Sequence, residues 1–182
     1  MVDIVVNSSE RIRKMVYASL FASMSSVGAY MVIPIGGPVP ITLQLLFVFF
    51  AGAFLGARWG MTSMLVYLLL GIAGLPVFAG GAAGLGVLLG PTGGYLLGFV
   101  AAAYVIGYLV EHFPTKSFFR VSLYFLAGMV TIYVFGYLQL IYVASLTPKE
   151  AFIIGIAPFI LLDAIKAIAA AVLFTHLDMS YD

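Results

Sequence analysis

The sequence predicts an all-α membrane protein with six transmembrane helices, and three observations lead to this fold class. First, 64% of the 182 residues are hydrophobic and only 8% are charged, whereas soluble domains carry about 25% charged residues. Second, the apolar residues form continuous runs close to the length of about 20 residues that a membrane helix needs. Third, these runs do not alternate between polar and apolar residues, which excludes the strands of a transmembrane barrel.

Six apolar segments organise the chain as one membrane domain, residues 1–182. The prolines and glycines of "IPIGGPVPI" separate the first two segments, and Arg58 ends the second. Residues 59–110 carry no charge but are too long for one helix, so we place a break in 71–94, which holds nine of the 20 glycines. The predicted spans are 15–33, 41–57, 60–75, 92–110, 121–144 and 159–175.

The distribution of basic residues predicts that both termini are cytoplasmic, because Lys and Arg are enriched in cytoplasmic segments of membrane proteins. With the N-terminus inside, the inner segments carry six of the eight basic residues: Arg11, Arg13, Lys14, Arg58, Lys116 and Arg120. The outer segments carry only Lys149, and Lys166 lies within the last span. The proline-rich loop 34–40 and the glycine-rich loop 76–91 then share the outer face.

Loop 76–91 is apolar as well as rich in glycine. At membrane depth such a backbone has to be buried in protein or line a cavity. It is therefore either a lid whose amides meet a ligand or a turn that only packs. The stretch "GPTGGY" is not a phosphate-binding loop, because Tyr95 stands where the GxxxxGK[ST] pattern has Lys. The chain therefore has no visible means of hydrolysing ATP.

Two charges, Asp163 and Lys166, interrupt the last span in "PFILLDAIKA". Their i, i+3 spacing puts them on one helix face, and each would cost about 2.5–3.5 kcal/mol at the bilayer centre. They form either the polar floor of a ligand site or an internal ion pair that fixes helix packing. Their depth follows from "TPKE", which predicts a short outer helix at 148–156, and from Pro158, which predicts a break before the last span.

Weaker candidates are Gln44 and the pair Ala18 and Ala22. Gln44 lies near the outer start of the second span and either lines a cavity or bonds a backbone carbonyl. Ala18 and Ala22 form a small-xxx-small stripe that lets another helix approach closely, from a partner or from the same chain. The chain has no cysteine and no HExxH or paired-carboxylate pattern, so we expect no metal, no cofactor and no enzyme activity.

Three stretches of the sequence resemble BioY, the biotin-binding S-component of energy-coupling factor (ECF) transporters. They are "IPIGGPVPITLQ" (33–44), "GIAGLPVFAGGAAGLGVLLGPTGGYLLGF" (71–99) and "PFILLDAIKA" (158–167). The resemblance implies a six-helix S-component fold that captures biotin at the outer face of a prokaryotic plasma membrane. It also implies a complex with a membrane coupling subunit and two cytosolic ATPase subunits.

The resemblance also implies roles for individual residues. Asp163 would accept a hydrogen bond from a ureido N–H, and Lys166 would meet either the ureido carbonyl or the carboxylate of the ligand's tail. A polar residue of the family's outer loop is replaced here by "AGGAAG". The remaining implied contacts are those of the Gly80 and Gly81 amides with the ureido ring and those of Ala18 and Ala22 with the coupling subunit. Phe78 and Tyr95 would cover the bicycle.

Other functions remain open on sequence alone. The chain could transport biotin by itself, as a homo-oligomer, or serve as the S-component for another water-soluble vitamin. It could also be a small intramembrane enzyme with Asp163 as a base, or a scaffold without a ligand.

Overall fold

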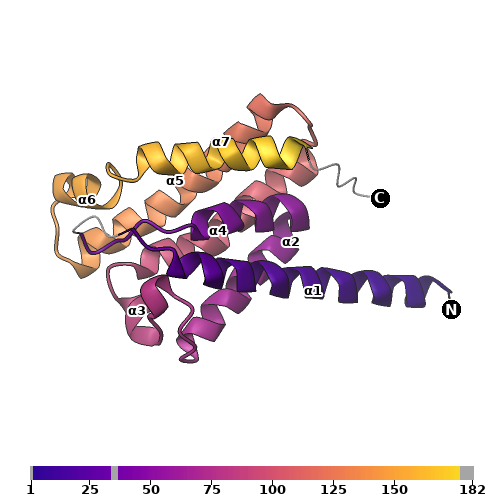
Figure 1. The fold of residues 1–182 in the computed structure, drawn as a ribbon, viewed down its shortest axis with the longest axis horizontal. Helices are drawn as coiled ribbons and strands as arrows, with labels where there is room; N and C mark the ends of the chain where they lie inside the picture. The colour runs from indigo at the N-terminus through magenta and orange to yellow at the C-terminus, as the bar shows by residue number, and fades with distance from the viewer. Residues whose placement is uncertain (1, 34–36, 177–182) are drawn as a thin grey trace.

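The computed structural model describes residues 2–33 and 37–176. Within these ranges it is a helical bundle, and its only β-type pairing is an isolated bridge between Ile33 and Ile41. The described residues form seven α-helices and one 3-10 turn, η1, and Figure 1 shows how the helices are arranged. Their bounds are α1 Val2–Tyr30, α2 Gln44–Ile72, η1 Ala79–Gly81, α3 Leu85–Leu89, α4 Gly93–His112, α5 Phe118–Val143, α6 Pro148–Gly155 and α7 Ile160–His176.

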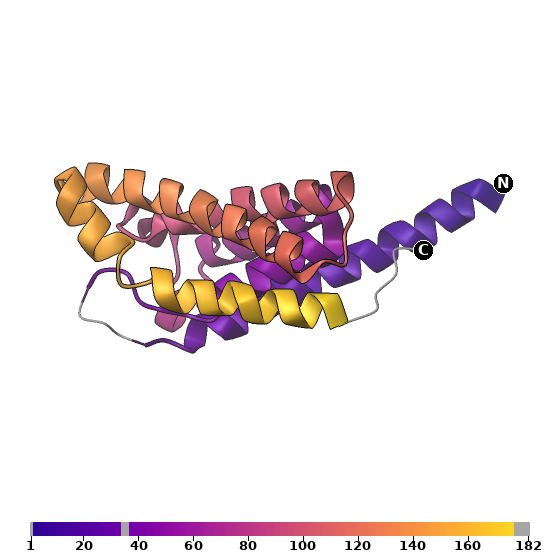
Figure 2. The same cartoon turned by 90° about the horizontal axis from the view of Figure 1, so that it is seen from above.

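Each of the six predicted spans lies mostly within a helix, although several predicted ends run up to three residues beyond it. The first is α1, which extends further toward the N-terminus than expected and projects beyond the bundle (Figures 1 and 2). This extension carries charges that favour a solvated helix, including an i, i+4 ion pair between Lys14 and Glu10 at 3.4 Å. By length and composition, the helices of the described ranges that could cross a membrane are α2, α4, α5 and the bent pair α6–α7.

Helix α2 is a hairpin of two arms, which match the second and third predicted spans. Gly56 interrupts it with φ 77° and ψ −179°, a backbone conformation that is almost restricted to glycine. The Gln44 amide of the first arm donates a hydrogen bond to the Tyr67 hydroxyl of the second. A straight helix would separate these residues by about 34 Å at 1.5 Å per residue, so the chain reverses direction at Gly56.

Glycines allow the central helices to approach one another closely. Helix α4 packs against both α2 and α5. A Cβ atom added at Gly52 would lie 2.7 Å from the Ala103 carbonyl oxygen, and one added at Gly98 would lie 2.8 Å from the Cα of Ile132. Both helix interfaces therefore place backbone against backbone, the packing that small residues permit in membranes.

The predicted break before the last span is confirmed. Thr147 and Glu150 form a capping box, in which the Thr147 N–H donates to Glu150 Oε2 at 2.9 Å and the Glu150 N–H donates to Thr147 Oγ1 at 3.4 Å. Helix α6 begins at Pro148, and its axis makes an angle of 50° with α7. In the first turn of α7, Asp163 is buried, whereas Ile160, Leu161 and Leu162 are exposed.

The described loop segments 37–43 and 76–91 lie at the end of the bundle opposite to the start of α1 and the end of α7. The start of α1 and the end of α7 are together at one end, and α3 and α6 are at the other (Figures 1 and 2). Loop 76–91, expected without helix, contains η1 and α3. Of the predicted loop 34–40, residues 34–36 lie outside the described residues. Which end faces the cytoplasm remains a prediction from the basic residues.

Candidate functional site

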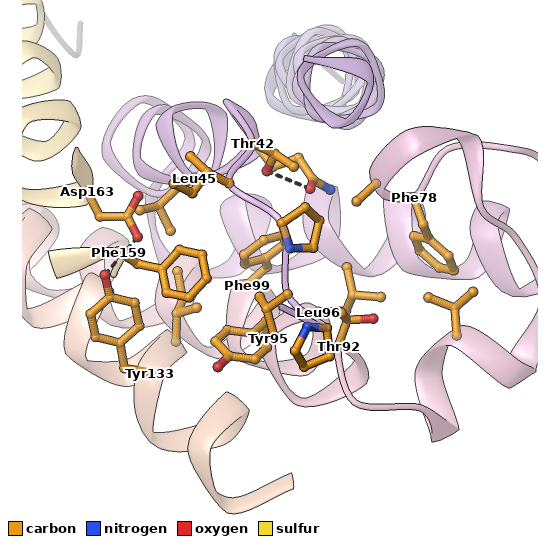
Figure 3. Close-up of a pocket in the computed structure, with 18 of the residues that line it drawn as sticks. Thr42, Leu45, Phe78, Thr92, Tyr95, Leu96, Phe99, Tyr133, Phe159 and Asp163 are labelled. Atoms are coloured by element: carbon orange, nitrogen blue, oxygen red, sulfur yellow. Dashed lines mark hydrogen bonds between the residues drawn. The ribbon is translucent and has the colours of Figure 1, made fainter. Parts of the chain in front are cut away.

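A cavity of about 300 Å³ lies among α2, α4, α5, α7 and the two loop segments (Figure 3). This volume is at the lower end of the range for small-molecule sites. Its lining is mainly apolar and aromatic. The lining residues are Pro38, Val39, Pro40, Ile41, Thr42, Gln44, Leu45, Phe78, Ala79, Ala82, Val87, Thr92, Tyr95, Leu96, Phe99, Ile132, Tyr133, Phe159, Asp163 and Lys166.

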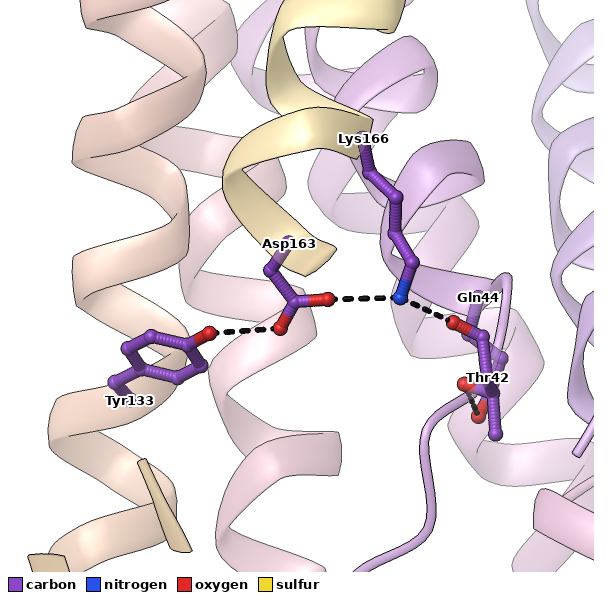
Figure 4. A network of polar contacts seen from close by, with 5 residues as sticks. All are labelled: Thr42, Gln44, Tyr133, Asp163 and Lys166. Atoms are coloured by element: carbon purple, nitrogen blue, oxygen red, sulfur yellow. Dashed lines mark hydrogen bonds and ion pairs between the residues drawn. The ribbon is translucent and has the colours of Figure 1, made fainter. Parts of the chain in front are cut away.

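The first turns of α7 bring both charges of the last span to this cavity. Asp163 is 6% exposed, and Lys166 Nζ lies 2.7 Å from Asp163 Oδ1. The i, i+3 spacing therefore produces an internal ion pair, one of the two alternatives considered from the sequence. Both members of this ion pair (Figure 4) also line the cavity, and their role as the polar floor of a ligand site stays a prediction.

Each member of the ion pair has a second partner on another element. Tyr133 of α5 donates its hydroxyl hydrogen to Asp163 Oδ2 at 2.7 Å, and Lys166 Nζ donates to the Thr42 carbonyl oxygen at 2.7 Å. Figure 4 shows Asp163 held between Tyr133 and Lys166. Sequence reasoning missed Tyr133, one of 11 tyrosines, because no motif links it to a carboxylate 30 positions away.

Gln44 lines the cavity, which is one of the two positions that its place in the sequence allowed. It also joins the two arms of α2. Its Oε1 accepts a hydrogen bond from Thr42 Oγ1 at 2.8 Å, and its Nε2 donates to the Tyr67 hydroxyl. Tyr67 donates in turn to the Val77 carbonyl oxygen at 3.1 Å. These bonds fix the ends of both loop segments beside the cavity.

Side chains from two further helices hold the glycine-rich loop by its carbonyl groups. Tyr30 of α1 donates to Pro76 O at 2.5 Å. On the other side, Gln139 Nε2 of α5 donates to Leu88 O at 2.8 Å and to Gly90 O at 2.6 Å. The loop is therefore anchored at both ends, while α3 itself buries no residue.

Two of the predicted loop contacts are absent from the cavity lining. Phe78 and Tyr95 line the cavity as predicted, but Gly80 and Gly81 do not; their neighbours Ala79 and Ala82 do. Gly81 lies beside Tyr30, because a Cβ atom added there would be 3.4 Å from the tyrosine ring. The structure therefore gives no support to the expected role of these two amides.

Ala18 and Ala22 lie inside the chain, against the second arm of α2. They are 3% and 1% exposed, and the Ser63 hydroxyl donates to the Ala18 carbonyl oxygen at 2.7 Å. The stripe therefore serves helix packing within the chain, one of the two interpretations that the sequence allowed. Contact with a coupling subunit through these two residues stays a prediction and would require α1 to move.

Comparisons with known proteins extend over nearly the whole chain. The model of the BioY family matches residues 4–182. "Biotin transporter BioY" of Thermotoga maritima is 41% identical over 166 residues, which cover 91% of this chain and 95% of that protein. "Probable biotin transporter BioY" of Pyrococcus horikoshii is 40% identical over 159 residues, which cover 87% and 92%.

A solved structure has the same fold. It is the 2.1 Å crystal structure of the S-component for biotin from an ECF-type ABC transporter. The two structures superpose with a TM-score of 0.85, at 28% sequence identity, over 93% of this chain and 92% of the other. The cavity described above therefore belongs to a bundle with the architecture of a known S-component.

Proposed function

Because this chain belongs to the BioY family, we propose that it is the membrane subunit that binds biotin for uptake by an ECF-type transporter. The observation that carries the proposal is the ion pair of buried Asp163 and partly buried Lys166 in a cavity of about 300 Å³. Ionisable groups within membrane-spanning helices are costly and point to a functional site by default. The chain is a transport subunit and not an enzyme.

The chemistry of the cavity suits biotin. Its bicycle is apolar and matches aromatic lining residues such as Phe78 and Phe99. Its ureido group donates two N–H bonds and accepts at the carbonyl oxygen. Asp163 accepts from a ureido N–H, because an ionised carboxylate can only accept, and Lys166 can only donate.

The energy for uptake comes from partner subunits, because this chain carries no ATPase motif. The proposed partners are a membrane coupling subunit and two cytosolic ATPase subunits, in the plasma membrane of a prokaryote. The relatives named above come from a bacterium and an archaeon.

In the proposed mechanism, biotin enters at the loop end of the bundle and the two loop segments close over it. The subunit then reorients against the coupling subunit. Biotin uptake by this chain in cells without any ECF ATPase would favour autonomous transport instead.

The proposal is tested by binding of labelled biotin to the purified wild-type chain in detergent. Competition with other water-soluble vitamins distinguishes biotin from the alternative ligands. Asp163→Asn and Lys166→Ala are each expected to weaken binding by at least about tenfold, because each removes a hydrogen bond to a charged group. Lys149→Ala, which removes an exposed lysine outside the cavity, is the matched control. Wild-type affinity in both cavity variants would overturn the assigned site.

A further inference from the structure

Thr42, near the end of loop segment 37–43, takes part in two hydrogen bonds that lead in different directions. Its carbonyl oxygen accepts from Lys166 Nζ at 2.7 Å, and its hydroxyl donates to Gln44 Oε1 at 2.8 Å (Figure 4). Lys166 Nζ also lies 2.7 Å from Asp163 Oδ1. Thr42 is therefore the residue that connects the ion pair of α7 to the start of α2.

The connection continues from Gln44 to the glycine-rich loop segment 76–91. Gln44 Nε2 donates to the Tyr67 hydroxyl, and this hydroxyl donates to the Val77 carbonyl oxygen at 3.1 Å. We call the three hydrogen bonds from Thr42 to Val77 the inter-loop series. Every hydrogen in it points from the first loop segment toward the second, an arrangement in which each bond strengthens its neighbours. The inter-loop series thus joins the two loop segments across both arms of α2.

The middle of the inter-loop series is shielded from water. Gln44 is 3% exposed and Tyr67 is 1% exposed. A buried donor or acceptor that loses its partner keeps its full desolvation cost. Displacing either loop segment alone would therefore leave a buried polar group without a partner, so the inter-loop series favours movement of both segments together.

Tyr67 acts on the cavity without lining it. Its ring packs edge-on against Phe78, with ring centroids 5.6 Å apart, and Phe78 is a fully buried residue of the cavity lining. Its hydroxyl accepts from Gln44, another residue of the lining. Tyr67 itself is not a lining residue, so its effect on a ligand passes through these neighbours.

From these observations we infer that Tyr67 is a positioning residue for the ligand site and makes the two loop segments close as one unit. Thr42 is the junction, because it bonds Lys166 through its carbonyl oxygen and Gln44 through its hydroxyl. A ligand that engages the ion pair thereby acts on the glycine-rich loop. This inference rests on the proposed function and deepens it, since it states how closure over biotin is coordinated.

The first test places a fluorescent label on the glycine-rich loop to report its closure. The chain has no cysteine, so Leu89→Cys, at a leucine of α3 that is 66% exposed, gives a single labelling site. Biotin should change the fluorescence of this label in the otherwise wild-type chain. A label that does not respond although biotin binds overturns the inference. Absence of biotin binding would instead overturn the proposed function.

The labelled chain is then compared with two variants that each remove one hydroxyl from the inter-loop series. Thr42→Val changes the first loop segment and keeps the carbonyl oxygen that holds Lys166, whereas Tyr67→Phe keeps the ring on Phe78. Each should at least halve the response of the label at saturating biotin. Each should also raise the biotin dissociation rate about fivefold or more, because one buried hydrogen bond is lost.

Two matched variants control for the loss of a hydroxyl as such. Tyr142→Phe changes a tyrosine that is 88% exposed, and Thr62→Val changes a threonine whose hydroxyl donates to the Arg58 carbonyl oxygen of its own helix. Both should keep the wild-type label response and dissociation rate. Equal responses in Tyr67→Phe and Tyr142→Phe would leave Tyr67 with a purely structural role and overturn the inference.

A double-mutant cycle separates one coupled series from two independent effects. Thr42→Val and Tyr67→Phe together should raise the biotin dissociation rate by at most about twofold beyond the larger single effect, because residues of one network are not additive. Single effects that multiply overturn the inference. If Tyr67→Phe does not fold, the label response of Thr42→Val decides, since its substitution and the label are on different loop segments.

Discussion

Tyr133→Phe is the substitution that tests most directly how the buried carboxylate is held. It removes the hydroxyl that donates to Asp163 Oδ2 at 2.7 Å and keeps the ring that lines the cavity. A hydrogen bond to a charged group contributes about 1.5–3 kcal/mol, and Asp163 is only 6% exposed, so water replaces the lost donor poorly. We expect the free energy of unfolding to fall by about 1.5–3 kcal/mol.

The same substitution should weaken biotin binding less than it weakens the fold. Tyr133 orients the carboxylate, and ordering a side chain upon binding costs about 0.5–1.5 kcal/mol, which corresponds to about twofold to twelvefold in affinity. The measurements are denaturant unfolding in detergent micelles and titration with labelled biotin. Tyr142→Phe, at a tyrosine that is 88% exposed, is the matched control.

A combination of variants separates orientation of Asp163 from a general effect of Tyr133 on packing. If Tyr133 acts through Asp163, its substitution should change affinity little once Asp163→Asn is present, since residues of one network are not additive. Equal losses in the wild-type and Asp163→Asn backgrounds would refute this reasoning. So would a Tyr133→Phe protein that matches Tyr142→Phe in both stability and affinity.

Three further predictions concern the loop, the hairpin and the capping box. Gln139→Leu removes both hydrogen bonds to the loop carbonyls, and each bond contributes about 1 kcal/mol. The substitution should therefore raise the biotin dissociation rate about fivefold or more. An unchanged rate in stopped-flow measurements would contradict this prediction. Gly56→Ala should lower the free energy of unfolding by about 1–3 kcal/mol, because alanine rarely adopts this backbone conformation and its Cβ would overlap the Glu111 side chain. An unfolding free energy equal to that of the wild type would contradict this prediction. Thr147→Ala should lower the free energy of unfolding by about 1 kcal/mol, because the N-cap of α6 is lost. Biotin affinity should stay unchanged. A large loss of affinity would mean that α6 also shapes the cavity.

Features with a local chemical cause could be predicted from the sequence. The apolar runs gave the positions of the helices, and the order Thr147, Pro148, Glu150 predicted the start of α6, because a capping box needs only neighbouring residues. Pro158 likewise predicted the break before α7. The pair on one face of α7 followed from the i, i+3 spacing.

Features that depend on contacts between distant segments could not be predicted. Tyr133 reaches Asp163 only because α5 packs on α7, and the glycine-rich loop gave no sign that Ala79 rather than Gly80 faces the cavity. The stripe of Ala18 and Ala22 fits a partner helix and a helix of the same chain equally well. Only the fold of the chain distinguishes these possibilities.

The proposed ligand binding, rather than stability, would explain why the last span contains an ion pair. Replacing a buried ion pair by well-packed apolar residues is often neutral or stabilising, whereas removing one partner alone is strongly destabilising. Asp163 and Lys166 have hydrogen-bond partners on α5 and at the end of the first loop segment, so the pair is tolerated in the empty site. Lys166 still keeps one donor and Asp163 keeps acceptor positions beyond these bonds, a capacity that apolar residues would lack and that the proposed ligand would use.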